Sequence, residues 1–189
     1  MKPENVLLDD EGHIKLTDFG LSKEDLKDNQ MTHTFCGTPE YLAPEVIKGA
    51  WYGKSVDWWS MGTLLFEMLT GLPPFYNENL HLMYEKIVTA PLIFPDDMSQ
   101  PARKLLAGLL ERDPRRRLGS NNGINDFKDH EFFAGIDWKR LEDKQIRPSF
   151  IPASSRGVMS TDNIDQATCV CDICIRYLHM LRLFTIFCL

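Results

Sequence analysis

The sequence predicts a mainly helical fold that carries one small β-hairpin. Residues 55–70 are apolar on nearly every side of the helix that they would form, which indicates a buried central helix. Residues 80–88 and 101–110 repeat apolar positions at helical spacing and predict two further helices. Near the start of the chain, two short apolar runs flank a polar turn at residues 9–12, which is typical of a β-hairpin over residues 6–16.

The composition is that of a globular protein with a core of its own. The chain has 189 residues, of which 43% are hydrophobic and 25% are charged. A net charge of -6 argues against a nucleic-acid partner and is compatible with basic partners. Cys36 is the only cysteine in the first 168 residues, and no signal-peptide pattern stands at the N-terminus, so we expect a reducing, cytoplasmic location. The central helix is too short and too polar to cross a membrane, and a membrane partner is not expected.

Turn and capping signals place the remaining elements. His13 stands beside the hairpin turn, where we expect an exposed side chain. Residues 23–34 are polar without periodicity and predict a loop. Residues 44–48 can form a short helix because proline is tolerated in a first turn, and Ser55 is a suitable N-cap for the central helix. Residues 126–133 predict a last short helix.

One ordered set of motifs points to a chemistry. Asp18-Phe19-Gly20 follows the second predicted strand, and its carboxylate could hold a hard cation while the glycine lets the backbone turn beside it. Such a tripeptide is weak by itself, because it recurs by chance. Here Lys2-Pro3-Glu4-Asn5 lies upstream of it and the run from Gly37 to Glu45 lies downstream. The set resembles the protein-kinase signature from the catalytic loop to the activation segment.

The resemblance extends to one group of kinases. Residues 34–41 resemble the activation loop of AGC-group serine/threonine protein kinases, and residues 144–152 resemble the start of their C-terminal tail. Protein kinase B, the serum- and glucocorticoid-regulated kinases and the ribosomal-protein kinases are the most similar in pattern. The resemblance covers residues 2–152 and implies a protein-kinase-like large, C-terminal lobe with a small β-hairpin, as a truncated kinase fold. It also implies ATP-dependent phosphate transfer to serine or threonine, with ATP and Mg²⁺ as cofactors.

The resemblance assigns roles at the phosphate-transfer site. Lys2 would contact the transferring phosphate, and Asn5 and Asp18 would bind magnesium. Leu7 would form the floor of the adenine pocket, although a plain core position is the alternative for this residue. Thr38 would bond the general-base aspartate of the family.

The resemblance also assigns regulation and substrate choice. Thr34 would be phosphorylated by an upstream activating kinase, with Lys23 as a cationic partner of the phosphate; the alternative is a solvated loop hydroxyl. Glu4 and Glu67 would bind substrate arginines, which implies protein substrates with basic residues near the target serine or threonine. A pocket for the residue after the phospho-acceptor would be formed by Phe35, Pro39 and Leu42.

Three further residues would have structural roles. By resemblance, Glu45 and Arg117 would form a buried pair, and Asp57 would brace the catalytic loop. A buried charge that loses its partner is costly, so both members of the pair are expected together. Arg115 and Arg116 are expected at a solvated edge, with a nuclear signal as a weak alternative.

The first residues shape the expectation for activity. Met1 precedes Lys2 directly, so the H-R-D segment with its general-base aspartate and the nucleotide-clamping small lobe do not occur among these residues. We therefore expect the isolated chain to be inactive. The alternatives to a kinase fragment are a non-catalytic lobe that acts as a binding or decoy module, and a fragmentary gene product. The sequence leaves open whether the truncation is natural or an artefact of gene prediction.

Three segments are expected along the chain. Residues 1–135 would form the partial kinase domain, residues 136–152 would begin the AGC C-terminal tail, and residues 153–189 would be a divergent, disordered or aberrant tail. For its apolar end, residues 169–189, a membrane-surface helix is an alternative. A zinc site is another alternative, although the ligand spacing fits no common site well; its ligands would be Cys169, Cys171, Cys174 and His179.

Overall fold

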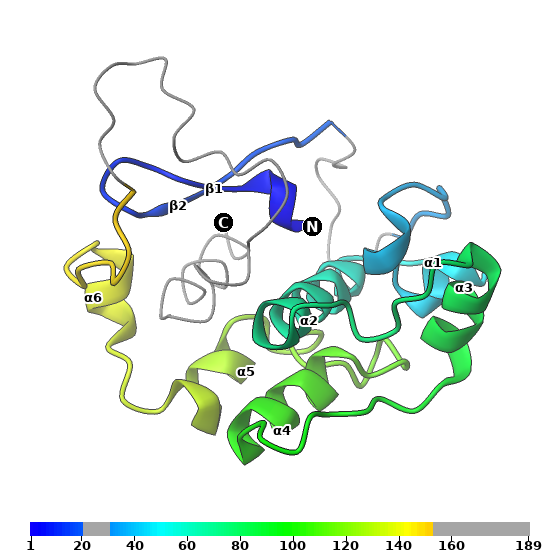
Figure 1. The fold of residues 1–189 in the computed structure, drawn as a ribbon. Helices are drawn as coiled ribbons and strands as arrows, with labels where there is room; N and C mark the ends of the chain where they lie inside the picture. Colours follow the sequence, from blue (N-terminus) through cyan, green and yellow to red (C-terminus); the bar gives the residue numbers. More distant parts are fainter. Residues whose placement is uncertain (21–30, 153–189) are drawn as a thin grey trace.

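A computed structural model describes residues 1–20 and 31–152 of the chain. The described part is mainly helical with one two-stranded antiparallel sheet, as the sequence predicts (Figure 1). Among the described residues, no helix is both long enough and apolar enough to span a membrane. The helices and strands, including the short 3-10 helices η1 to η3, are η1 (Pro3–Asn5), β1 (Val6–Leu8), β2 (Ile14–Leu16), η2 (Pro39–Tyr41), α1 (Pro44–Ile47), α2 (Ser55–Thr70), α3 (Leu80–Thr89), α4 (Gln100–Leu109), α5 (Asn125–Lys128), η3 (Glu131–Phe133) and α6 (Trp138–Glu142).

Helix α2 forms the centre of the core. Its side chains from Trp58 to Phe66 are all buried, which explains why the sequence shows no polar face. In Figure 1, α2 lies between the hairpin and α4, and it packs directly on α4 and η2. At Gly62 the helices approach closely, because a Cβ atom there would lie 2.7 Å from Cβ of Leu109. Gly71 ends the helix in the left-handed conformation with φ 88°.

The hairpin forms where the polar turn predicts it. Strands β1 and β2 pair antiparallel with Leu7 opposite Lys15. The Asp9 carboxylate closes the turn by accepting the backbone N–H of His13 at 2.6 Å. Gly12 has φ 83°, and a Cβ atom at this position would overlap the carbonyl oxygen of Phe150. The hairpin turn is therefore covered by the segment that follows α6.

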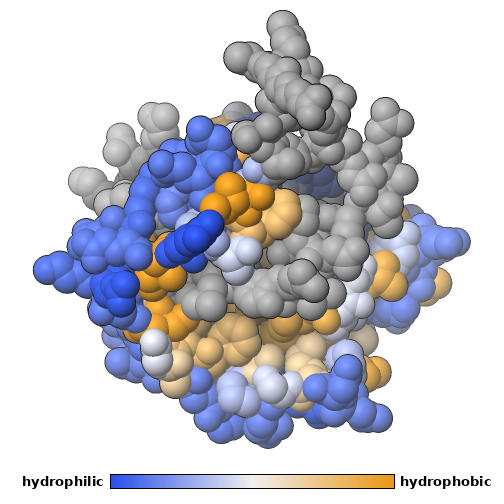
Figure 2. All heavy atoms as spheres, turned by 60° about the vertical axis from the view of Figure 1, so that its left-hand side comes forward, coloured by the Kyte–Doolittle hydropathy of each residue, from blue (hydrophilic) through white to orange (hydrophobic). Residues whose placement is uncertain are grey.

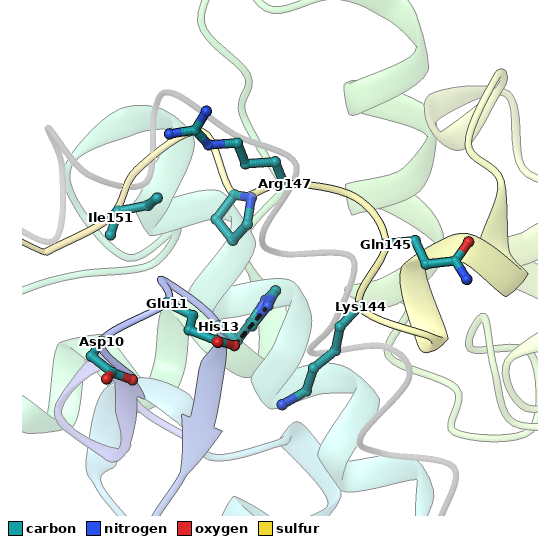
Figure 3. A pocket seen from close by; sticks show the side chains of 8 residues that line it. Asp10, Glu11, His13, Lys144, Gln145, Arg147 and Ile151 are labelled. Atoms are coloured by element: carbon teal, nitrogen blue, oxygen red, sulfur yellow. Dashed lines mark ion pairs between the residues drawn. The ribbon is translucent and has the colours of Figure 1, made fainter.

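His13 is buried, with an exposed fraction of 5%, and the expectation of an exposed side chain is wrong. Figure 3 shows the cause: the segment carrying Lys144 and Arg147 passes over the hairpin turn. A hollow of about 460 Å³ remains between them, with Glu11 3.8 Å from Nε2 of His13. Local sequence around the turn contains no signal for this cover, because it comes from the other end of the described chain.

The surface of the molecule carries both apolar and hydrophilic side chains. In Figure 2, apolar side chains form a band bordered by hydrophilic ones. The large apolar side chains that remain exposed in the described residues include Leu7 on β1 and Phe19. Most of the buried core lies on and around α2, and the hairpin contributes Ile14 to it.

Helix ends and short elements differ in part from the expectations. Asn79 and Ser99 cap α3 and α4 through their side chains. Ser55 is the first residue of α2, and Lys54 occupies the N-cap without a side-chain hydrogen bond, so the expected cap is wrong. The expected helix over residues 126–133 is divided into α5 and η3 at His130, which is extended and accepts the N–H of Phe132 through Nδ1 at 3.1 Å.

Candidate functional site

Asn5 bonds to Thr17, the residue before Asp18, at the open end of the hairpin. The carbonyl oxygen of Asn5 accepts the backbone N–H of Thr17 at 2.9 Å, so Asp18 follows directly from the residue that is tied to Asn5. Asp18 is exposed and has φ 59°, a left-handed conformation that is uncommon outside glycine. Its Oδ1 accepts the N–H of Gly20 at 3.4 Å, which orients the carboxylate.

This pair fits a magnesium–phosphate site. Magnesium prefers oxygen ligands and is usually bound through one or two carboxylates together with substrate phosphates. Asp18 and Asn5 can supply one carboxylate and one amide oxygen. Among the described residues there is no group of three or more His, Cys, Asp or Glu side chains that could hold a metal ion by itself. One carboxylate and one amide oxygen form the kind of donor set that magnesium completes with phosphate oxygens.

Lys2 and Leu7 lie on either side of η1, close to Asn5 in the chain. The carbonyl of Lys2 accepts the N–H of Asn5 at 3.1 Å, which places Lys2 in the turn that leads into η1. Leu7 is 50% exposed on β1, so the alternative that it is a plain core residue is wrong. An exposed leucine on a strand offers an apolar surface to a flat ligand.

A cluster of carboxylates surrounds Tyr41. The Tyr41 hydroxyl donates a hydrogen bond to Glu67 of α2. Burial raises the pKa of Glu67, the hydrogen bond from Tyr41 lowers it, and the nearby Glu4 and Glu40 raise it again. Burial and the same carboxylates also raise the pKa of Tyr41. Oε2 of Glu40 is buried and has no hydrogen-bond partner among the described residues. The cluster thus has excess negative charge in a partly desolvated place, which suits a cationic ligand.

The sequence pointed to Glu4 and Glu67 but missed Tyr41 and Glu40. Tyr41 and Glu67 are 26 residues apart, and no local spacing indicates their contact. Glu40 could be recognised as one more acid close to Glu4 and Glu67 only once the fold was known.

The segment that resembles a kinase activation segment, residues 31–45 of the described chain and called the activation segment below, presents Thr34 on the surface. Thr34 is exposed, and its carbonyl oxygen accepts a hydrogen bond from the Tyr52 hydroxyl at 2.6 Å. Lys23, the expected partner of a phosphate at Thr34, lies outside the described residues. Its role therefore stays a prediction.

The residues of the expected substrate pocket lie around a sharp turn at Gly37. A Cβ atom at Gly37 would lie 2.9 Å from the buried side chain of Leu42. Phe35 is exposed and meets the ring of Tyr84 on α3 edge-on, with centroids 6.3 Å apart. Pro39 begins η2 directly after the partly exposed Thr38. The turn thus carries an exposed aromatic side chain above a buried leucine.

Glu45 and Arg117 meet in the core. Both terminal nitrogens of Arg117 donate to the Glu45 carboxylate, at 2.7 and 2.9 Å. The guanidinium also donates to the carbonyl oxygens of Ser55 and Glu111, and it lies over the Trp59 ring at 5.2 Å. These contacts fix α1 and the start of α2 against the segment after α4.

The other structural candidates are at the surface. Asp57 is exposed in the first turn of α2 and interacts electrostatically with the amino group of Met1. Arg115 and Arg116 are exposed, as expected, and Arg115 contacts Asp113 at 3.4 Å. The residues of the alternative zinc site and the apolar end of the chain lie outside the described residues.

Comparisons with known proteins identify what this arrangement is similar to. The protein kinase domain family matches residues 1–133. Serine/threonine-protein kinase YPK1 of Saccharomyces cerevisiae is 55% identical over 166 residues, which cover 88% of this chain and 24% of the relative. Serine/threonine-protein kinase gad8 of Schizosaccharomyces pombe is 54% identical over 87% of this chain and 29% of the relative. Serine/threonine-protein kinase sgk-1 of Caenorhabditis elegans is 48% identical over 88% of this chain and 36% of the relative. The chain therefore spans about a quarter to a third of the length of these relatives.

Proposed function

Because the chain belongs to the protein kinase family, and its similarity to AGC-group serine/threonine kinases is confirmed, we propose that it carries the large-lobe part of a kinase that phosphorylates serine or threonine in arginine-containing substrates. The observation that carries the proposal is the carboxylate cluster of Glu4, Glu40 and Glu67 around Tyr41. The chain covers only part of its relatives, so both the activity and the substrate class are proposals.

The carboxylate cluster would recognise an arginine side chain upstream of the target hydroxyl. A guanidinium group donates two parallel hydrogen bonds to a carboxylate, and such charge-assisted bonds are about twice as strong as neutral ones. Burial destabilises the ionised form of Glu67, and this is the main reason why its pKa is raised. A bound arginine offsets this cost, since it supplies the opposite charge. The same cluster would repel acidic substrates.

The hairpin end would hold the phosphate donor. Mg²⁺, when bound with ATP, neutralises charge on the phosphates and keeps the transferring group in line. Asp18 and Asn5 would bind this cation through oxygen, and Lys2 would contact the transferring phosphate. The exposed face of Leu7 would lie against the adenine ring. Thr38 would orient the general-base aspartate of an H-R-D segment.

Thr34 would act as the switch. A phosphate adds roughly two negative charges and needs cationic partners to order a loop. Thr34 is exposed, so an upstream activating kinase can reach it. Lys23 and the arginine of an H-R-D segment would be the partners of the phosphate.

A chimera tests the proposal. Residues 2–152 are joined to an AGC small lobe that ends in the H-R-D segment, and phosphate transfer is measured on paired peptides with and without an upstream arginine. We expect Glu67→Gln to lower the preference for the arginine peptide about tenfold or more, because a hydrogen bond to a charged group is worth roughly 1.5–3 kcal/mol. Glu78→Gln, at an exposed position after α2, is the matched control and should keep the preference.

Two outcomes would contradict the proposal. Equal rates on both peptides in the unmodified chimera would remove the substrate class, and equal rates for wild type and Thr34→Ala, with Thr34 shown to be phosphorylated, would remove the switch. We also propose that a polypeptide of only these 189 residues does not transfer phosphate, because a general base alone contributes ~10²–10⁴ in rate. Incorporation well above that of an Asp18→Asn control would refute this.

A further inference from the structure

The loop between α1 and α2 is tied to the activation segment by backbone hydrogen bonds. Thr32 and Tyr52 form an antiparallel bridge in which each N–H donates to the carbonyl of the other residue, at 2.8 Å in both directions. The activation segment thereby gains a pairing partner from the segment that precedes α2. The bridge lies two residues before Thr34.

The Tyr52 side chain extends the same contact to Thr34 itself. Its hydroxyl donates to the Thr34 carbonyl oxygen at 2.6 Å, a short and direct hydrogen bond. Burial and the neighbouring Cys36 thiol raise the pKa of Tyr52, so the hydroxyl keeps its proton and stays a donor at neutral pH. The Thr34 hydroxyl meets that of Thr32 at 3.5 Å. The Thr34 main chain is thus held while its side chain stays at the surface.

A contact between two aromatic rings adds to the connection between these two segments. The rings of His33 and Trp51 lie with centroids 4.6 Å apart, so two successive residues of each segment take part. The loop that carries Trp51 and Tyr52 has firm ends, because Arg117 binds both Glu45 of α1 and the carbonyl oxygen of Ser55 at the start of α2. The activation segment is therefore bonded to a loop whose two ends are anchored in the core.

We infer that Tyr52 is a positioning residue that fixes the main chain of Thr34, so that a phosphate added there is held in one place. The inference rests on the proposed phosphorylation of Thr34 and deepens it. An ordered main chain reduces the conformational entropy that is lost when the phosphate binds its cationic partners. A phosphatase must move the phosphorylated residue into its own active site, and a main chain that is bonded in place resists this movement. Tyr52 would therefore lengthen the lifetime of the active form.

Hydrogen exchange on the full 189-residue chain tests the tether without any phosphorylation. The variants are Tyr52→Phe, which keeps the ring and removes only the hydroxyl, and Tyr76→Phe, the matched control at an exposed tyrosine after α2. We expect amides of residues 32–36 to exchange about three- to tenfold faster in Tyr52→Phe, which is the range that loss of one hydrogen bond gives. Tyr76→Phe should match wild type. Replacement of Tyr52 by p-aminophenylalanine, which retains a donor, should restore slow exchange.

A phosphatase assay completes the test. With Thr34 phosphorylated in the kinase chimera, we expect removal of the phosphate to be about three- to tenfold faster in Tyr52→Phe than in Tyr76→Phe, for the same reason. Unchanged exchange at residues 32–36 in Tyr52→Phe overturns the inference. Equal acceleration of exchange in α2 also overturns it, because Tyr52 would then only support the fold. Faster exchange at 32–36 alone, in a protein whose Thr34 no activating kinase modifies, supports the tether and overturns the proposed switch.

Discussion

Glu45 accepts two hydrogen bonds from Arg117 although 72 residues separate them in the chain. Both side chains are buried, with exposed fractions of 6% and 1%. A buried ion pair contributes little net stability compared with apolar side chains, yet removal of one member leaves a charge without a partner. The Trp59 ring and two carbonyl oxygens also surround the guanidinium, so Arg117 would be left in a polar but incompletely neutralised place.

We expect Glu45→Ala or Arg117→Ala to lower the free energy of unfolding by about 3 kcal/mol or more, the range for breaking a buried pair. Urea denaturation of the full chain measures the change. Arg115→Ala, which removes an exposed arginine from the same run, should leave the midpoint nearly unchanged. Midpoints of the two pair variants that equal that of Arg115→Ala would show that the pair is not needed.

We expect Tyr41→Phe to raise the pKa of Glu67 further. The Tyr41 hydroxyl stabilises the ionised carboxylate, and its loss leaves burial and the neighbouring carboxylates as the main influences. Glu67 would then become protonated at a higher pH than in the wild type. As the pH falls, binding of an arginine peptide would therefore begin to weaken at a higher pH. A pH series of KM for the arginine peptide in the kinase chimera, or carbon-13 NMR of the Glu67 carboxyl, measures this. A curve identical to that of Tyr76→Phe would count against the hydrogen bond.

We expect acid to destabilise the fold through His130. Burial lowers its pKa, Lys104 lowers it as well, and Glu131 opposes both. The unfolded chain therefore binds a proton near the ordinary histidine pKa of about 6.5 while the folded chain still resists it, so stability falls as pH drops through this region. His130→Asn, whose amide oxygen can still accept the N–H of Phe132, should weaken this part of the pH dependence in thermal melts. His81→Asn, at an exposed site on α3, should preserve it.

We expect Gly12→Ala to detach the segment that covers the hairpin turn. Gly49→Ala is the matched control, since Gly49 also has a left-handed φ, of 67°, but has nothing within 4 Å of the added Cβ. Both variants share the left-handed strain of roughly 1–2 kcal/mol, and only Gly12→Ala displaces the Phe150 carbonyl. Trypsin should therefore cut faster after Lys144 in Gly12→Ala. Equal cutting rates in both variants would show that the segment does not depend on this contact.

The long helices and the hairpin could be predicted from the sequence because local rules determine them. Apolar periodicity marks α2 with its observed ends and marks α3 and α4 to within a residue, and the Asp9 to Gly12 turn is marked by its own chemistry. Family resemblance supplied Glu45 and Arg117 as candidates, which no spacing rule could have joined over such a distance.

The remaining differences come from contacts between distant segments. His13 is buried by residues near 148, and the carboxylate cluster needs η1, η2 and α2 to be brought together. The break at His130 depends on a side chain that captures a backbone N–H, which competes with helix formation but leaves no periodic signal. Helix α6, capped by Asp137, was not expected because its few residues are too short for a periodic pattern.

The contact between Gly12 and Phe150 also bears on how the protein is made. During synthesis the hairpin leaves the ribosome before the helices around α2, and the segment that covers its turn emerges only after α6. In the nascent chain, His13 therefore stays uncovered while the helices around α2 are synthesised, because the covering segment follows them. Contacts between such distant residues form slowly and late. A nascent chain stalled before residue 144 would thus present an uncovered hairpin turn to chaperones and proteases.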